Sequence, residues 1–219
     1  ATGAATARCL IQVTPDGQRT MNTFLGASSR LTVDDVDEEL VAGSRVLYCE
    51  GYLWDLDEAK AAIRHAMDIA LANGVTSSMT LSDPFCVDRH RGEWLDLIGD
   101  RVDLLFGNIA EVESLLGTDN VDKIVAGMRA MTEFAFVTNG GHGSIVISAD
   151  EVLTVPAVAV DRVIDTTGAG DLYSSGVLAG MASGFDLATA AWMGSCAASE
   201  VIGHVGARPL VDLSSYCAP

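Results

Sequence analysis

The sequence has few positive charges. It carries 13 Lys and Arg against 30 Asp and Glu, a formal net charge of -17, and its only lysines are Lys60 and Lys123. Proteins that follow a nucleic-acid backbone need many basic residues to displace counterions, so we expect no nucleic-acid partner. Both lysines lie in helical patterns, and neither stands in a Gly-x-x-x-x-Gly-Lys-Ser/Thr loop. Any bound phosphate must therefore be held by backbone N–H groups, arginine and a divalent cation.

Metal-binding, redox and membrane signals are also missing. The five cysteines are widely spaced and form no Cys-x-x-Cys pair, and no two histidines have the spacing of a His-x-x-x-His metal site. This cysteine usage is typical of the cytosol. No apolar stretch approaches the roughly 20 residues that span a bilayer. With 49% hydrophobic and 20% charged residues, we expect a compact, soluble, cytoplasmic protein with no membrane partner.

The order of patterns along the chain predicts an α/β fold. Alternating residues on either side of Pro15, Asp16 and Gly17 indicate a β-hairpin, and Asp55 with Glu58 resembles a capping box opening a helix that Gly74 ends. Further strands are expected at 46–49, 75–81, 103–106, 134–138 and 144–148, and further helices at 110–116, 121–131, 170–182 and 187–202. Such alternation predicts a three-layer αβα sandwich with a mostly parallel sheet. We expect one domain over 1–219, with a lid hairpin at 1–28 and an αβα core at 29–219.

The segment Val163–Gly176 carries the clearest chemical signal, because a glycine-rich turn runs directly into a helix. Unpaired N–H groups of Gly168, Ala169 and Gly170 would bind an anion there, assisted by the helix dipole. Asp171 would lie beside that anion, where a carboxylate can take the proton of an attacking hydroxyl. The alternative is that Asp171 is only a favourable charge in a first helical turn. A dinucleotide fingerprint is excluded, since Tyr173 replaces its third glycine.

The heptapeptide Asp165-Thr-Thr-Gly-Ala-Gly-Asp171 resembles the signature of the ribokinase-like (PfkB) carbohydrate and nucleoside kinases. The resemblance implies that Asp171 is the catalytic base and that Gly168, Ala169 and Gly170 form the anion hole. Asn108-Ile-Ala-Glu111 resembles the family's Asn-x-x-Glu motif, which implies that Asn108 and Glu111 organise Mg²⁺ through water. A simple helix cap is the alternative for that motif.

Other segments extend the resemblance, which is closest to the adenosine kinases. Thr138-Asn-Gly-Gly-His-Gly143 is similar to the family's phosphate loop, implying ATP contacts by Thr138, Gly140 and Gly143; a hairpin turn is the alternative. Arg19 corresponds to a lid arginine that reaches the γ-phosphate, although a solvated arginine is equally compatible. His204 lies where relatives surround adenine, and Asp165 and Thr167 resemble a monovalent-cation (K⁺) site, with Thr167 also near the nucleotide.

The resemblance implies ATP-dependent transfer of the γ-phosphate to a hydroxyl of a small nucleoside or sugar, most of all adenosine. Two alternatives are a sugar kinase acting on ribose or fructose, and a nucleotide-binding module that does not catalyse. The resemblance implies that roughly the first third of a family member is missing here, including an aspartate that grips the sugar. We therefore expect weak catalysis from the 219 residues alone, and a sheet edge that favours association, for example as a homodimer.

Overall fold

A computed structural model describes residues 3–219. These residues form two compact units. The first comprises residues 3–8, 23–135 and 147–150, and the second comprises residues 9–22, 136–146 and 151–219. Among the described residues, no helix is both long enough and apolar enough to cross a membrane.

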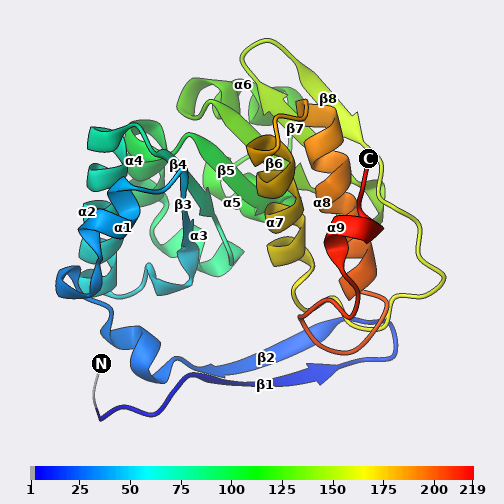
Figure 1. The fold of residues 1–219 in the computed structure, drawn as a ribbon, viewed down its shortest axis with the longest axis horizontal. Helices are drawn as coiled ribbons and strands as arrows, with labels where there is room; N and C mark the ends of the chain where they lie inside the picture. The colour runs from blue at the N-terminus through cyan, green and yellow to red at the C-terminus, as the bar shows by residue number, and fades with distance from the viewer. Residues whose placement is uncertain (1–2) are drawn as a thin grey trace. The chain divides into compact units, whose positions relative to one another are not determined.

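Six strands form one sheet in the order in which they occur in the sequence (Figure 1). They are β3 (Val46–Glu50), β4 (Thr76–Thr80), β5 (Leu104–Asn108), β6 (Phe134–Thr138), β7 (Ser144–Ser148) and β8 (Val152–Val155). Strands β3, β4 and β5 are parallel, with Val46 opposite Thr76 and Ser78 opposite Leu104. The links from β6 to β7 and from β7 to β8 are too short for a crossover, so these strands form hairpins. Helices flank this sheet, which confirms the predicted αβα class.

Local signals mark the ends of several helices of the first unit. They are α1 (Glu38–Ala42), α2 (Asp57–Asn73), α3 (Pro84–Arg89), α4 (Arg91–Arg101), α5 (Ile109–Leu116) and α6 (Val121–Met131). Helix α2 ends at Gly74, which adopts the left-handed conformation (φ 67°) as predicted. Asp83 caps α3 and Pro84 occupies its first position, a start signal that the sequence analysis overlooked.

The predicted capping box at Asp55 is wrong. Helix α2 begins at Asp57, and its cap residue Leu56 makes no side-chain hydrogen bond. The Asp55 carboxylate instead accepts two hydrogen bonds from Arg89, at 3.2 and 2.7 Å, and lies 2.7 Å from His90 Nε2. An ion pair with residues from other helices has therefore displaced the local cap.

Trp54 and Trp94 form the centre of the core of the first unit. Both are completely buried, and their ring centroids are 4.9 Å apart. The two tryptophans therefore pack against each other. Buried side chains of α2 and α4, such as Met67 and Ile98, continue this core.

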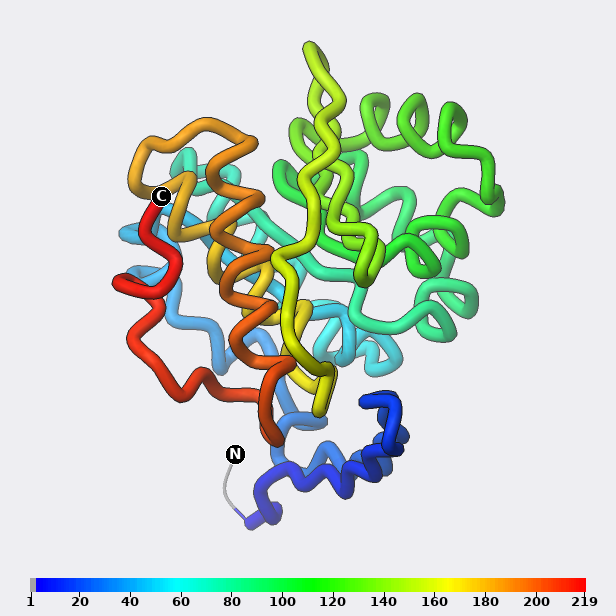
Figure 2. Tube along the Cα trace, turned by 90° about the vertical axis from the view of Figure 1, so that its right-hand side faces the viewer, coloured from blue at the N-terminus to red at the C-terminus, as the bar shows by residue number. Residues whose placement is uncertain are grey.

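The second unit contains two long helices that lie side by side, α7 (Ala169–Ala182) and α8 (Leu187–Val201) (Figures 1 and 2). Their close approach depends on small residues. A Cβ at Gly176 would lie 2.6 Å from Met193 O, and one at Gly194 would lie 2.7 Å from Tyr173 O. The short helix α9 (Leu213–Tyr216) contacts α8.

Strands β1 (Arg8–Val13) and β2 (Arg19–Phe24) form the predicted hairpin. Its turn closes with Gly17 N–H donating to Thr14 O at 2.9 Å, and Gly17 has a φ of 79° that favours glycine. Short 3₁₀ segments cover Gly26–Arg30, Val33–Asp35, Gly51–Leu53 and Gly140–His142.

Candidate active site

The glycine-rich turn at the start of α7 presents unpaired backbone donors. Among the described residues, the N–H groups of Gly168, Gly170 and Asp171 have no hydrogen-bond partner, whereas Ala169 N–H points to Thr166 O at 3.3 Å. Gly168 has a φ of 82°, and a Cβ there would lie 2.9 Å from Ala207 O. A Cβ at Gly170 would meet no atom within 4 Å. The turn is therefore open on the side of Gly170, where an anion can approach the free donors.

The Asp171 side chain is exposed beside these donors. It lies in the first turn of α7, and no other described residue forms a hydrogen bond or ion pair with its carboxylate. A carboxylate without a protein partner can accept a proton from a bound hydroxyl. The geometry therefore permits the role that the sequence suggested, without excluding that of a first-turn charge.

Asp165 anchors the other end of the turn. Only 2% of the residue is exposed, and Oδ1 accepts hydrogen bonds from Thr167 Oγ1 (2.6 Å) and Thr167 N–H (2.9 Å), while Oδ2 accepts one from Gly206 N–H (3.0 Å). Burial by itself would raise the pKa of this carboxyl. The hydrogen bonds from Thr167 and Gly206, with a smaller contribution from Arg19, outweigh burial and lower the pKa below its ordinary value.

Arg19 and the tip of the hairpin contact the same turn. Arg19 Nη1 donates to Thr166 Oγ1 at 2.8 Å, and the Thr166 hydroxyl in turn donates to Gly17 O at 3.2 Å. Arg19 is thus exposed but held next to Asp165, so it is not freely solvated. Thr166, at the centre of this contact, was missed by the sequence analysis, although it lies within the motif.

The segment from Thr138 to Gly143 forms the turn between β6 and β7. Asn139 N–H donates to Gly143 O at 2.7 Å, which closes the hairpin, and the N–H groups of Gly140 and Gly141 have no partner among the described residues. A Cβ at Gly143 would lie 2.0 Å from Val155 O, so only glycine fits there. The hairpin-turn alternative is therefore correct as a description of the structure, and it leaves two donors available for phosphate.

Tyr173 joins this turn to the start of α7. Its hydroxyl donates to Ser144 Oγ at 2.8 Å, and Ser144 directly follows Gly143. Because β7 runs back from the carboxyl end of β6, Ser144 and the start of α7 lie at that end of the strand. Ligands in open α/β sheets bind beyond the carboxyl ends of the strands.

Asn108 and Glu111 lie in the first unit and form a complete capping box. Asn108 Oδ1 accepts from Glu111 N–H at 3.0 Å, and Glu111 Oε2 accepts from Asn108 N–H at 2.9 Å. Glu111 is only 5% exposed, and Asn108 Nδ2 donates to its second oxygen at 2.8 Å. Asn108 and Glu111 therefore cap α5, and the box also fixes an amide and a carboxylate at the carboxyl end of β5.

His204 follows the carboxyl end of α8. Its Nε2 lies 3.4 Å from Glu200 Oε2, and Glu200 Oε1 accepts from Leu210 N–H at 3.0 Å. Glu200 therefore links the end of α8 to both sides of Ala207, the residue that packs against Gly168. The sequence analysis overlooked it, although its i, i+4 spacing from His204 was an available signal.

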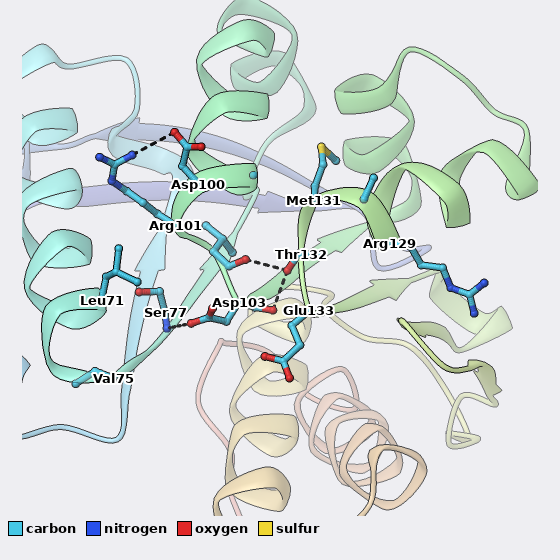
Figure 3. Close-up of a pocket in the computed structure, with 13 residues that line it drawn as sticks. Leu71, Val75, Ser77, Asp100, Arg101, Asp103, Arg129, Met131, Thr132 and Glu133 are labelled. Atoms are coloured by element: carbon cyan, nitrogen blue, oxygen red, sulfur yellow. Dashed lines mark hydrogen bonds and ion pairs between the residues drawn. The ribbon is translucent and has the colours of Figure 1, made fainter.

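A cavity of about 300 Å³ in the first unit lies at the opposite end of the strands (Figure 3). Its lining comes from Leu71, Val75 and Ser77 and from residues 99–103 and 129–133, most of which precede the starts of β4, β5 and β6. Asp103 accepts from Ser77 N–H at 2.8 Å, and Thr132 Oγ1 donates to Asp103 O at 2.8 Å. The hydrogen bonds of these polar groups link neighbouring strands. Because the cavity lies where the strands begin and not at their carboxyl ends, it is not part of the candidate site.

In residues 3–219, no group of three or more His, Cys, Asp or Glu side chains could hold a metal ion by themselves. Any metal at the candidate site would thus need ligands from water or a bound substrate in addition to protein oxygens.

Comparisons with known proteins identify the family of this chain. A family model described as pfkB family carbohydrate kinase matches residues 1–212. An adenosine kinase from Sinorhizobium meliloti superimposes with a TM-score of 0.93, 46% identity and 96% of this chain covered. A probable sugar kinase from Rhizobium etli CFN 42 superimposes with a TM-score of 0.93, 44% identity and 95% coverage. The adenosine kinase of Saccharomyces cerevisiae is 26% identical over 225 residues, or 96% of this chain.

The chain spans 64% of the length of each of the two bacterial structures and 65% of the yeast enzyme. The family match nevertheless extends over almost all of it, from the hairpin through the Asp165–Asp171 turn to the segment after α8. The chain belongs to the pfkB family of carbohydrate kinases.

Proposed function

We propose that this chain carries the phosphoryl-transfer site of an ATP-dependent kinase that phosphorylates a hydroxyl of a nucleoside or sugar. The observation that carries the proposal is the pairing of unpartnered donors with an unpartnered base. The N–H groups of Gly168, Gly170 and Asp171 and the Asp171 carboxylate are all free at the start of one helix. Membership of a carbohydrate kinase family supports the same function.

In this mechanism Asp171 accepts the proton of the acceptor hydroxyl as its oxygen attacks the γ-phosphorus of ATP. A positioned base contributes about 10²–10⁴-fold to the rate. The free N–H groups of the turn, together with Ala169 N–H if it turns from Thr166, stabilise charge on the transferred phosphoryl oxygens. Loss of one such donor typically costs roughly 10²–10³-fold. Arg19, held by Thr166, adds positive charge on the same side.

The nucleotide would be bound by segments of the second unit. The free N–H groups of Gly140 and Gly141 suit phosphate oxygens, while Thr138 and Gly143 shape their turn. Thr167 keeps Asp165 in place, and His204 lies on the segment that packs against Gly168. With two lysines in the chain, most of the phosphate charge must be met by amides, arginine and metal.

Mg²⁺ would be held through water by Asn108 and Glu111. Asn108 hydrogen-bonds both Glu111 oxygens and so holds the carboxylate beside its own amide, and carboxylate and amide oxygens are ligands that suit a hard cation. When bound, Mg²⁺ neutralises phosphate charge. For K⁺, Asp165 Oδ2 accepts one protein hydrogen bond, which leaves one lone pair for a monovalent cation near Thr167. A titration of ATP affinity with KCl against NaCl at constant ionic strength tests the K⁺ proposal.

The acceptor most strongly supported is adenosine, because the S. meliloti structure is an adenosine kinase. A sugar remains the second candidate, since the R. etli sugar kinase matches this chain almost equally well. The test combines calorimetric titration with ATP·Mg and measurement of ADP formation with adenosine, ribose and fructose. Turnover with adenosine above the sugars supports the first candidate. ATP binding without ADP formation from any acceptor indicates a nucleotide-binding module, and absence of ATP binding overturns the proposal.

A further inference from the structure

Two of the five cysteines meet at the carboxyl-terminal end of the second unit. Cys196 lies in α8 and Cys217 directly follows α9, and each is 4% exposed. Both belong to one buried cluster, and Cys196 Sγ donates to Tyr216 O, the carbonyl of the residue before Cys217, at 3.6 Å. Together with Ala197 they form a small cluster bordered by Trp192 and Leu213. This contact joins the last helix of the chain to α8.

The segment between these cysteines packs on the catalytic turn. Gly206 N–H donates to Asp165 Oδ2, and Ala207 lies where a Cβ on Gly168 would need to be. Leu210 N–H donates to Glu200. In Figures 1 and 2 the segment leaves the end of α8 and returns beside it. Contacts with Asp165, Gly168 and Glu200 thus hold the segment between the two cysteines, and Cys217 lies beyond its far end.

We propose that Cys196 and Cys217 are an oxidisable pair, and that a disulfide between them fastens residues 203–217 to α8. The oxidant would be a small disulfide such as oxidised glutathione. The Cys217 thiolate attacks one sulfur of the oxidant, and the other sulfur leaves as a thiol. The Cys196 thiolate then attacks Cys217 Sγ and releases the second small thiol. Two cysteine thiols are oxidised to one disulfide, and one small disulfide is reduced to two thiols, which take up the two protons.

The folded structure slows the oxidation of these two thiols but keeps them in one cluster, where they can form a bond with each other. Burial, followed by the neighbouring Cys196 sulfur, raises the pKa of Cys217 to about 12, so the docked thiol reacts slowly. Helix α9 has only four residues, and so short a helix can open locally at little cost in free energy. Opening exposes Cys217 to the oxidant, and redocking returns it to Cys196. A disulfide of about 2.05 Å can form when redocking brings the two sulfurs together.

The sequence allows a direct test, because Glu200 separates the two cysteines. The reduced 219-residue protein is incubated with oxidised and reduced glutathione at several ratios, and free thiols are then alkylated in denaturant. Cleavage after glutamate should release fragments 152–200 and 201–219 joined by a disulfide, with Cys9, Cys49 and Cys86 alkylated. The chemistry does not depend on phosphoryl transfer, so a failed kinase assay leaves the test intact.

Cys196→Ser and Cys217→Ser should each abolish the joined fragments. Cys86→Ser is the matched control, because Cys86 is also buried and its Sγ donates to a backbone carbonyl, Gly51 O at 3.8 Å. It should leave the linkage unchanged. In the wild-type protein, oxidation should slow hydrogen exchange at Gly206 and Leu210 by about tenfold or more, since the bond restrains the open segment. Five alkylated cysteines at every glutathione ratio, or fragment 201–219 found only as a glutathione adduct, would overturn the proposal.

Discussion

The Tyr173 hydroxyl donates a hydrogen bond to Ser144 Oγ at 2.8 Å, and both side chains are buried. Tyr173 lies in the second turn of α7, and Ser144 follows the last glycine of the β6–β7 turn. This side-chain contact thus joins two segments that offer free backbone donors. Burial raises the pKa of Tyr173 to about 12, despite the hydrogen bond to Ser144, so the phenol stays protonated at neutral pH.

Tyr173→Phe should lower the free energy of unfolding by about 1–3 kcal/mol, because it removes the partner of a buried hydroxyl. Urea denaturation measures this loss. Ser144→Ala should cost a similar amount, and the double variant should cost less than the sum of the two. Tyr216→Phe, on a ring that is 49% exposed, serves as the control and should change little. Strict additivity would show that the contact contributes nothing.

Asp171→Asn keeps the shape of the side chain but removes the base, so phosphoryl transfer should fall by about 10²–10⁴-fold. ATP affinity should hardly change, because the backbone donors remain. Steady-state ADP formation and calorimetry separate the two effects. Asp122→Asn is a matched control, since Asp122 is an exposed acid in the first turn of α6. If Asp171→Asn turns over at the normal rate, Asp171 is not the base.

Gly170→Val should weaken both ATP binding and turnover, because its side chain would enter the open space in front of the free N–H groups. Stability should change little beyond the helix propensity of valine. Gly92→Val provides the comparison: Gly92 is also the second residue of its helix, and a Cβ there also meets nothing within 4 Å. Equal effects of the two substitutions on ATP affinity would argue against an anion site at α7.

Thr166→Val should release the hairpin tip, since its hydroxyl bonds both Arg19 and Gly17 O. Cleavage by trypsin after Arg19 should accelerate several-fold, because proteases cut where the backbone opens. Thr154→Val, on an exposed residue of β8, makes the same exchange away from the hairpin and should have no effect. An unchanged cleavage rate in Thr166→Val would show that the contact does not restrain the tip.

Asp165 should contribute to stability in a pH-dependent way. Its pKa in the folded protein lies below the ordinary value of 3.8, so its contribution is fully present above that value and is lost as the pH falls through the lower, folded pKa. Asp165→Asn should therefore reduce the unfolding free energy at pH 7 by about 1–3 kcal/mol. Urea denaturation from pH 7 to pH 3 should show this difference shrinking only below about pH 4. A difference that is constant to pH 3 would contradict the assignment.

Most elements could be predicted because their signals are local. Gly74 and Gly117 end helices in the left-handed conformation, and alternating residues mark the hairpin strands around Gly17. Helices α3 and α4 were missed although Asp83 and Pro84 mark a start. The capping box predicted at Asp55 was wrong for a physical reason. A carboxylate near a helix start can either cap the helix or pair with a distant arginine, and the sequence does not show which of the two is more stable.

The sequence by itself determined which residues are candidates for the site, since the Asp165–Asp171 motif is contiguous and its free N–H groups follow from a helix start. Only the tertiary structure decided what holds those residues in place. Gly206 on Asp165, Arg19 on Thr166 and Tyr173 on Ser144 are contacts between residues far apart in the chain. No local pattern encodes them, because each arises only when packing of the core brings distant donors and acceptors within hydrogen-bonding range.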